Sequence, residues 1–136
     1  MSNRHTGDQG RINKKLMALH FSSSASTYDS HAALQREIAW QLVDWATPGL
    51  SFPGGTPLRA LDIGCGTGFL SRFLHDKIHP DSIVAIDMAA GMLERTRKLD
   101  TNDTLRLVQA DGERLPFAAE SFDLVASSTA FQWFTT

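Results

Sequence analysis

The stretch LRALDIGCGTGFLSRFLHDKI, residues 58–78, decides the fold. Its first seven residues are mostly apolar and predict a buried strand that ends at Gly64. Residues 68–78 carry apolar side chains at intervals of three and four, which predicts a helix with one buried face. Gly64, Gly66 and Gly68 lie between the two elements. Glycines at such a junction permit a tight turn and a close approach of the backbone to a ligand.

The same alternation continues toward the C-terminus. Residues 82–87, 105–111 and 122–130 predict three further strands, and residues 89–99 predict a second helix. Strands that alternate with helices form a parallel sheet with right-handed crossovers, so we expect an α/β fold. Ligands of such sheets bind beyond the carboxyl ends of the strands. The sequence places the glycine turn, three aspartates and residues 127–129 at or near four of these ends, which predicts one common site.

The N-terminal part has a different organisation. Residues 1–12 are polar and predict a loose tail, and residues 13–57 form a helical segment followed by a linker. Within them, the Ser-rich residues 21–31 predict a loop or a frayed helix entrance. Residues 30–46 predict an amphipathic helix, capped by Ser30, whose packing face is a stripe of apolar side chains. The members of that stripe are Ala33, Leu34, Ile38, Leu42 and Trp45. Residues 48–57 contain three prolines and three glycines and predict a linker, so residues 58–136 form the core.

Composition excludes several classes of protein. The chain has 136 residues, which suits one small domain, and 13 basic against 15 acidic side chains. This balance argues against a nucleic-acid binder, which is normally basic. The single cysteine, Cys65, favours a reducing compartment. The N-terminus lacks the apolar core of a secretory signal, and no window approaches the ~18 apolar residues of a membrane span. We therefore expect a cytoplasmic protein without a membrane or nucleic-acid partner.

The acidic residues indicate the kind of ligand. Asp62 precedes the glycine turn, where a carboxylate repels phosphates and suits a ligand with a positive amine. Asp87 ends the second strand, where a carboxylate accepts hydrogen bonds from ribose hydroxyls. Asp111 ends the third strand and is placed to accept from the amine of adenine. A ligand with an amine, a ribose and an adenine but no pyrophosphate is S-adenosylmethionine. The G-x-G-x-G spacing also differs from the dinucleotide pattern G-x-G-x-x-G.

The motifs LDIGCGTG, VAID, QADGERLPF and SFDLV resemble those of class I S-adenosylmethionine-dependent methyltransferases over residues 58–130. The resemblance implies a Rossmann-like parallel sheet of seven strands in the order 3-2-1-4-5-7-6. It also implies a set of cofactor-binding residues, with Asp62 at the methionine amine, the glycines at the methionine and ribose, Asp87 at the ribose, and Met88 and Asp111 at the adenine. The expected set is Asp62, Gly64, Gly66, Gly68, Asp87, Met88, Asp111, Gly112 and Ser127.

The flanking segments FSSSASTYDSHAALQRE and SSTAFQWF resemble the malonyl-[acyl-carrier-protein] O-methyltransferases of biotin synthesis. This resemblance implies an N-terminal lid over the cofactor and an acceptor that is a malonyl thioester on acyl-carrier protein. The lid and acceptor residues would be Tyr28, His31, Gln35, Gln132 and Trp133. Only about four of the family's seven strands are present, so we expect a truncated product or fragment; the alternative is a sheet that another chain completes.

The expected acceptor does not require a general base. A malonyl carboxylate is ionised at pH 7, since a carboxylic acid in water has a pKa of about 4. The chain also shows no obvious catalytic pair of histidine and aspartate in the core, so no catalytic residue is assigned. The expected role of the protein is alignment and exclusion of water.

Other features have simpler interpretations. Cys65 is interpreted as a small buried filler rather than a nucleophile, and His75 and His79 as surface histidines without a third metal ligand. The basic residues Arg95, Arg97 and Lys98 are interpreted as a solvated helix face. The alternatives are a methyltransferase for a quinone precursor or free carboxylic acid, a non-catalytic cofactor-binding fragment, and a nicotinamide oxidoreductase that the glycine spacing disfavours.

Overall fold

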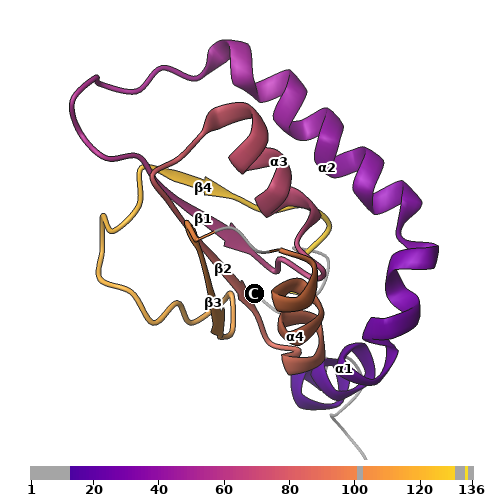
Figure 1. The fold of residues 1–136 in the computed structure, drawn as a ribbon. Helices are drawn as coiled ribbons and strands as arrows, with labels where there is room; N and C mark the ends of the chain where they lie inside the picture. The colour runs from indigo at the N-terminus through magenta and orange to yellow at the C-terminus, as the bar shows by residue number, and fades with distance from the viewer. Residues whose placement is uncertain (1–12, 101–102, 131–133, 135–136) are drawn as a thin grey trace, which may run out of the picture.

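A computed structural model describes residues 13–100, 103–130 and 134 of the chain. Its centre is a parallel sheet in the order β3-β2-β1-β4 (Figure 1). The strands are β1 (Arg59–Ile63), β2 (Ser82–Asp87), β3 (Leu105–Gln109) and β4 (Leu124–Ala126). The α/β class and the order of these four strands are confirmed.

Strands β3 and β4 end two and four residues earlier than predicted, at Gln109 and Ala126 instead of Asp111 and Ala130. After β3 the chain turns, and the Asp111 carboxylate accepts the backbone N–H of Glu113. After β4 a side chain replaces the ladder, because the Ser127 hydroxyl donates to the carbonyl of Ile63 on β1.

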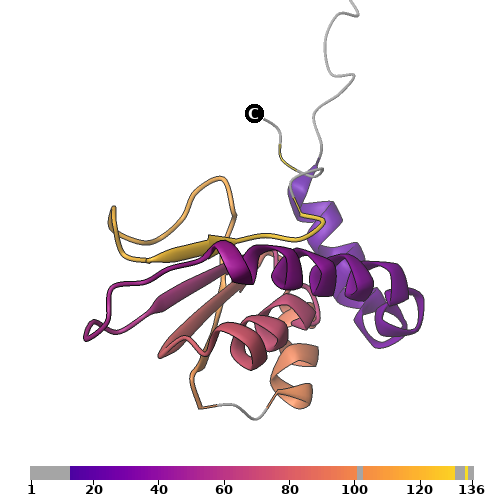
Figure 2. The same cartoon turned by 90° about the horizontal axis from the view of Figure 1, so that it is seen from above.

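Helices cover one face of the sheet and a long loop covers the other (Figures 1 and 2). The helices are α1 (Lys14–His31), α2 (Ala33–Ala46), α3 (Phe69–Ile78) and α4 (Ala90–Leu99), with a short 3-10 turn η1 (Thr47–Gly49). Helices α3 and α4 are the crossovers β1–α3–β2 and β2–α4–β3, α2 packs on α3, and α1 packs on α4. In the described part of the chain, no helix has the length and apolar character needed to cross a bilayer.

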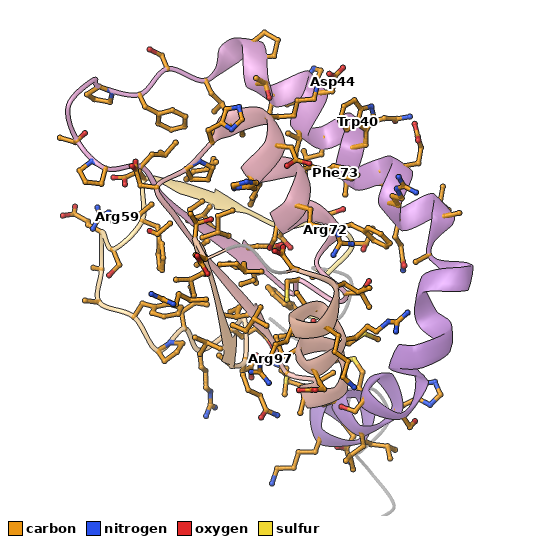
Figure 3. All side chains as sticks on the ribbon, in the orientation of Figure 1. Trp40, Asp44, Arg59, Arg72, Phe73 and Arg97 are labelled. Atoms are coloured by element: carbon orange, nitrogen blue, oxygen red, sulfur yellow. The ribbon has the colours of Figure 1, made fainter. Side chains whose placement is uncertain are left out.

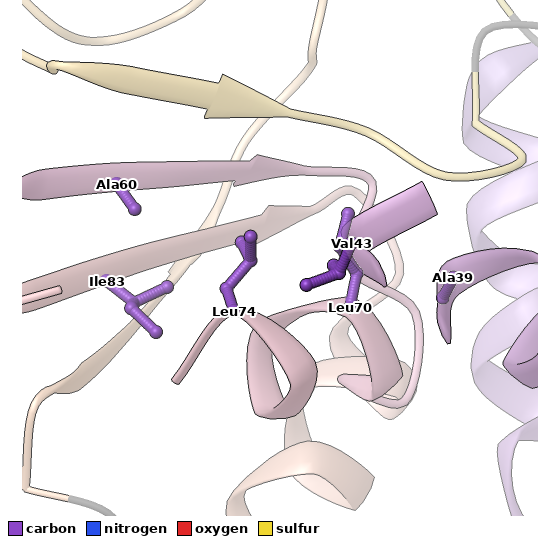
Figure 4. Packing of buried hydrophobic residues seen from close by; sticks show 6 residues of the cluster. All are labelled: Ala39, Val43, Ala60, Leu70, Leu74 and Ile83. Atoms are coloured by element: carbon purple, nitrogen blue, oxygen red, sulfur yellow. The ribbon is translucent and has the colours of Figure 1, made fainter. Parts of the chain in front are cut away.

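The core divides between the two faces because alternate residues of a strand point in opposite directions. On the helical face, Ala60 and Ile83 meet Leu70 and Leu74 of α3 and the small side chains of α2 (Figure 4). On the other face, a second cluster gathers under the loop of residues 110–123. Its members are Leu61, Ile63, Ile86, Val84, Val108, Ala110, Phe117, Phe122 and Phe134.

The predicted packing face of α2 is wrong. Leu34 and Trp45 are 70% and 82% exposed, whereas Ala39 and Val43 are each 2% exposed and face the core. Of the predicted stripe, Leu42 packs against the core cluster. Small residues at the contact let α2 approach α3 closely, and Trp40 adds an edge-to-face contact with Phe73 on α3, with ring centroids 5.3 Å apart (Figure 3).

The predicted loop at residues 21–31 is also wrong, because α1 is continuous through it. Ser30 lies inside α1 and does not cap α2, whose N-cap position is Ala32 without a side-chain cap bond. The reason is a close crossing of α1 and α4: the backbone N–H of Gly91 donates to the Ser22 hydroxyl at 3.1 Å. A Cβ at Gly91 would lie 2.3 Å from the Ser22 carbonyl oxygen, so glycine is required there. The predicted tail, residues 1–12, lies outside the described residues.

Candidate functional site

An open pocket of about 680 Å³, counting the solvent at its mouth, lies at the carboxyl edge of the sheet. Residues that follow β1, β2, β3 and β4 line it, together with the first turn of α1. The lining residues are Lys14, Met17, Ile63, Gly64, Gly66, Asp87, Met88, Met92, Ala110, Asp111, Gly112, Thr129, Ala130 and Phe134. The strand ends therefore converge on one pocket.

The glycine turn after β1 is held against the end of β2. Gly64 and Gly66 have φ values of +70° and +55°, which are rare for residues with a side chain. The Asp87 carboxylate accepts the backbone N–H of Gly66 at 2.9 Å and that of Ala89 at 2.8 Å. Burial raises the pKa of Asp87, and these backbone hydrogen bonds oppose the rise. The carboxylate is thus fixed in direction at the wall of the pocket.

Asp62 lies under the same turn and is fully buried. The Ser71 hydroxyl donates to its Oδ2 at 2.7 Å, but no described residue hydrogen-bonds its Oδ1. Burial, with a smaller contribution from the charge of Asp87, raises the pKa of Asp62 to about 7. Burial of a carboxylate oxygen without a hydrogen bond costs free energy. This oxygen is therefore a candidate acceptor for a hydrogen bond from a ligand.

Asp62 lines a smaller hollow that shares Gly64, Gly66 and Thr129 with the main pocket. The hollow contains a second buried atom without a hydrogen bond among the described residues, the hydroxyl of Ser128. A ligand that extends from the main pocket past the glycine turn would reach both atoms. The site therefore suits an elongated ligand with polar groups at its far end.

The opposite end of the pocket is acidic and rich in methionine. Asp111 accepts hydrogen bonds from the Lys14 ammonium at 2.9 and 3.0 Å, and Met17, Met88 and Met92 supply thioether side chains. Such side chains adapt to flat rings. A Cβ on the neighbouring Gly112 would lie 2.7 Å from Phe134 and 2.8 Å from Ile63, which leaves room for glycine alone.

The structure brings together most of the residues that the sequence predicted. Asp62 lies in the adjoining hollow, and so does the predicted lid residue Gln35. Two others make contacts within the protein. Gly68 is the N-cap residue of α3, where a Cβ would meet Thr96, and the Ser127 hydroxyl donates to the carbonyl of Ile63. The predicted residues that line the main pocket are Gly64, Gly66, Asp87, Met88, Asp111 and Gly112.

The remaining lid and acceptor predictions cannot be placed against this geometry. Tyr28 and His31 fall in α1, but their side chains are outside the described part of the chain, and so are Gln132 and Trp133 entirely.

Sequence reasoning missed the contribution of α1. Lys14 and Met17 line the pocket from the first turn of that helix, and no local pattern distinguishes Lys14 from its neighbour Lys15. Phe134 was also missed, whereas Thr129 belongs to residues 127–129, which the sequence placed at the common site.

Cys65 and the basic face of α4 behave as interpreted, but His75 is not a surface histidine. It is half-buried, and its Nδ1 is buried without a hydrogen bond to any described residue, whereas His79 is exposed. Burial raises the pKa of the Cys65 thiol well above its ordinary value, which keeps it protonated and inert. Arg97 and Lys98 form ion pairs with Glu94 on an exposed face of α4. Within the described ranges, no group of three or more side chains is arranged to hold a metal ion.

Comparison with known proteins identifies the family. Residues 60–136 match the family described as "methyltransferase domain". The malonyl-[acyl-carrier protein] O-methyltransferases of Priestia megaterium and Acetivibrio thermocellus are 35% and 37% identical over 125 and 123 residues, which are 92% and 90% of this chain. The chain spans 44% and 42% of their lengths.

Solved structures agree with the family match. An S-adenosylmethionine-dependent methyltransferase from Mesorhizobium loti superposes with a TM-score of 0.53 at 30% identity, over 65% of this chain and 41% of that one. The parallel sheet in the order β3-β2-β1-β4, with its glycine turn after β1, is the corresponding part of a Rossmann-like class I methyltransferase fold. The chain therefore belongs to the methyltransferase domain family.

Proposed function

We propose that the chain binds S-adenosylmethionine in this pocket and transfers its methyl group to the free carboxylate of a malonyl thioester on acyl-carrier protein. The observation that carries the cofactor assignment is the placement of three carboxylates at three strand ends around one elongated site. One of them, Asp62, keeps a buried oxygen without a partner among the described residues. The names of the relatives support the acceptor.

The residues fit the groups of this cofactor. Asp62 Oδ1 would accept from the methionine amine, and the fixed Asp87 carboxylate would accept from the ribose hydroxyls. Met88 and Asp111 would contact the faces and the amine of the adenine. A dinucleotide fits less well, because its pyrophosphate would face the carboxylate of Asp62 at the glycine turn.

When bound, S-adenosylmethionine supplies a methyl group that is already electrophilic, so the protein has to align it and exclude water. The glycine turn and Asp87 would hold the cofactor's sugar, and the hollow near Ser128 adjoins the turn. A malonyl carboxylate is ionised at neutral pH, because carboxylic acids in water have pKa values of about 4, and it requires no general base.

Calorimetric titration with S-adenosylhomocysteine tests the cofactor site. We expect saturable binding by the purified chain, its loss in Asp87→Ala, and its retention in Asp44→Ala, which removes an exposed carboxylate from α2. Binding of NADH in place of S-adenosylhomocysteine would overturn the assignment in favour of an oxidoreductase.

Transfer of a labelled methyl group to malonyl-loaded acyl-carrier protein tests the acceptor. Labelling of that substrate above a quinone precursor and free carboxylic acids supports the proposal. Labelling of one of the others would assign a different small-molecule methyltransferase. Binding without transfer to any acceptor would show that the chain is a cofactor-binding fragment.

A further inference from the structure

We propose that Lys14 is a positioning residue for the cofactor: its ammonium fixes the carboxylates of Asp111 and Glu113 and holds the first turn of α1 over the pocket. This inference rests on the proposed function, since it concerns the same ligand. It assigns a role to the N-terminal end of α1, ahead of the lid segment that the sequence singled out.

The contacts of Lys14 are specific. Its Nζ donates to both oxygens of Asp111, at 3.0 and 2.9 Å, and forms an ion pair with Glu113. Lys14 and Asp111 are 97 residues apart in the sequence. The side chains of Lys14, Asp111 and Glu113 are 20%, 25% and 10% exposed, so solvent screens this group less than it screens an ordinary surface pair.

Lys14 orients the Asp111 carboxylate but leaves it able to accept a further hydrogen bond. Asp111 Oδ1 accepts from Lys14 and from the backbone N–H of Glu113, whereas Oδ2 accepts from Lys14. A carboxylate oxygen accepts about two hydrogen bonds, so Oδ2 retains one position. Because Asp111 lines the pocket, that position is available to the amine of a bound base.

The same contact determines where α1 lies. Lys14 is the first residue of α1, and Met17, one turn later, lines the pocket beside it. The second attachment of the helix is the hydrogen bond between Ser22 and Gly91 on α4. Loss of the Lys14 charge would therefore release the first turn of α1 with Met17, and leave the rest of α1 packed on α4. It would also leave two neighbouring carboxylates without their shared cation, which favours movement of Asp111.

The test compares Lys14→Met with Lys15→Met. Both variants remove one lysine charge from the same turn and keep a long unbranched side chain, but Lys15 is exposed and does not line the pocket. We expect Lys14→Met to weaken S-adenosylhomocysteine binding roughly five- to tenfold in calorimetry, mostly through faster dissociation in stopped flow, and Lys15→Met to match the wild type. Lys14→Arg, which keeps the charge, should recover most of the affinity.

A measurement on the ligand-free chain separates this proposal from the proposed function. Amide hydrogen exchange of residues 14–18 should accelerate in Lys14→Met and stay unchanged in Lys15→Met, while residues of β1 and β2 keep their protection. If wild type fails to bind the ligand but the exchange difference appears, the proposed function is wrong and the contact itself stands.

Equal exchange and equal affinity in the two methionine variants would overturn the role of Lys14. Tighter binding by Lys14→Met would overturn it too, because the lysine would then compete with the base for Asp111. Should Lys14→Met fail to fold, Glu113→Gln probes the same contact from its acidic partner. The proposal expects faster exchange of residues 14–18 in this variant as well, and unchanged exchange would contradict it.

Discussion

Replacing Asp62 by asparagine removes a buried charge and keeps the shape of the side chain. The fold holds the carboxyl group of Asp62 away from water, and its pKa is about 7, against 3.8 for an aspartate side chain in water. A carboxyl whose pKa is raised by folding binds its proton more tightly in the folded state. Stability is therefore highest in acid, declines as the pH rises from about 4 to about 7, and stays reduced above that range.

The size of the effect follows from the pKa. At 1.36 kcal/mol per pKa unit, ionisation of Asp62 costs the folded chain about 4 kcal/mol at pH 8, and roughly 2 to 3 kcal/mol of this loss falls between pH 5 and pH 8. Asparagine does not titrate and can still accept the hydrogen bond from Ser71. Urea denaturation should therefore show that the wild type loses about this much free energy of unfolding from pH 5 to pH 8 relative to Asp62→Asn.

Asp44→Asn is the matched control, because it removes the same charge from an exposed position on α2. Its free energy of unfolding should stay close to that of the wild type, because the side chain is exposed. Parallel stability profiles for Asp62→Asn and wild type would refute the argument, since they would mean that Asp62 titrates alike in the folded and unfolded chains.

The same substitution connects stability with binding. A ligand amine that pairs with Asp62 favours the ionised carboxylate, so affinity for S-adenosylhomocysteine should rise from pH 6 to pH 8 in the wild type. Asp62→Asn should bind more weakly and lose this rise. A wild-type affinity that does not change over this pH range would show that the ligand amine does not pair with Asp62.

Three further substitutions test the fold, two of them with a control substitution. Val43→Ala should lower the free energy of unfolding by ~2 kcal/mol in urea titrations, whereas Trp45→Ala should change it by less than about 0.5 kcal/mol, because only the first side chain is buried. Gly91→Ala should separate α1 from α4 and accelerate amide exchange in α1, while Gly54→Ala, where no atom lies within 4 Å of the added carbon, should not. Thr96→Val removes a buried hydroxyl that donates to the glycine-turn carbonyl at 2.9 Å, and should lower the melting temperature by an amount equivalent to about 1 kcal/mol.

The core of the fold was predictable because its signals are local. Continuous apolar runs before Gly64 and up to Asp87 predicted β1 and β2, and three- to four-residue spacing predicted α3. The strand ends are less sharply encoded. A turn in which Asp111 accepts the N–H of Glu113 follows β3, and after β4 the Ser127 hydroxyl takes the place of a backbone donor to β1.

The two N-terminal helices were less predictable for different reasons. Periodicity shows that α2 is amphipathic, but the packed face is selected by close approach to α3, which favours Ala39 and Val43 over the larger Leu34 and Trp45. In α1, Ser22, which disfavours an isolated helix, lies at the close crossing with Gly91 on α4. Tertiary packing there outweighs intrinsic helix propensity.

The same distinction divides the candidate site. Residues such as Asp87 and Asp111 follow parallel strands, and the topology alone brings such residues to one edge of the sheet. Lys14 and Met17 reach that edge only because α1 is docked by contacts between distant parts of the chain. The strand-end residues should therefore determine which ligand is recognised, since their positions persist when α1 moves. The α1 residues should determine how long that ligand stays, because the Lys14 contact holds Asp111 and Met17 beside it.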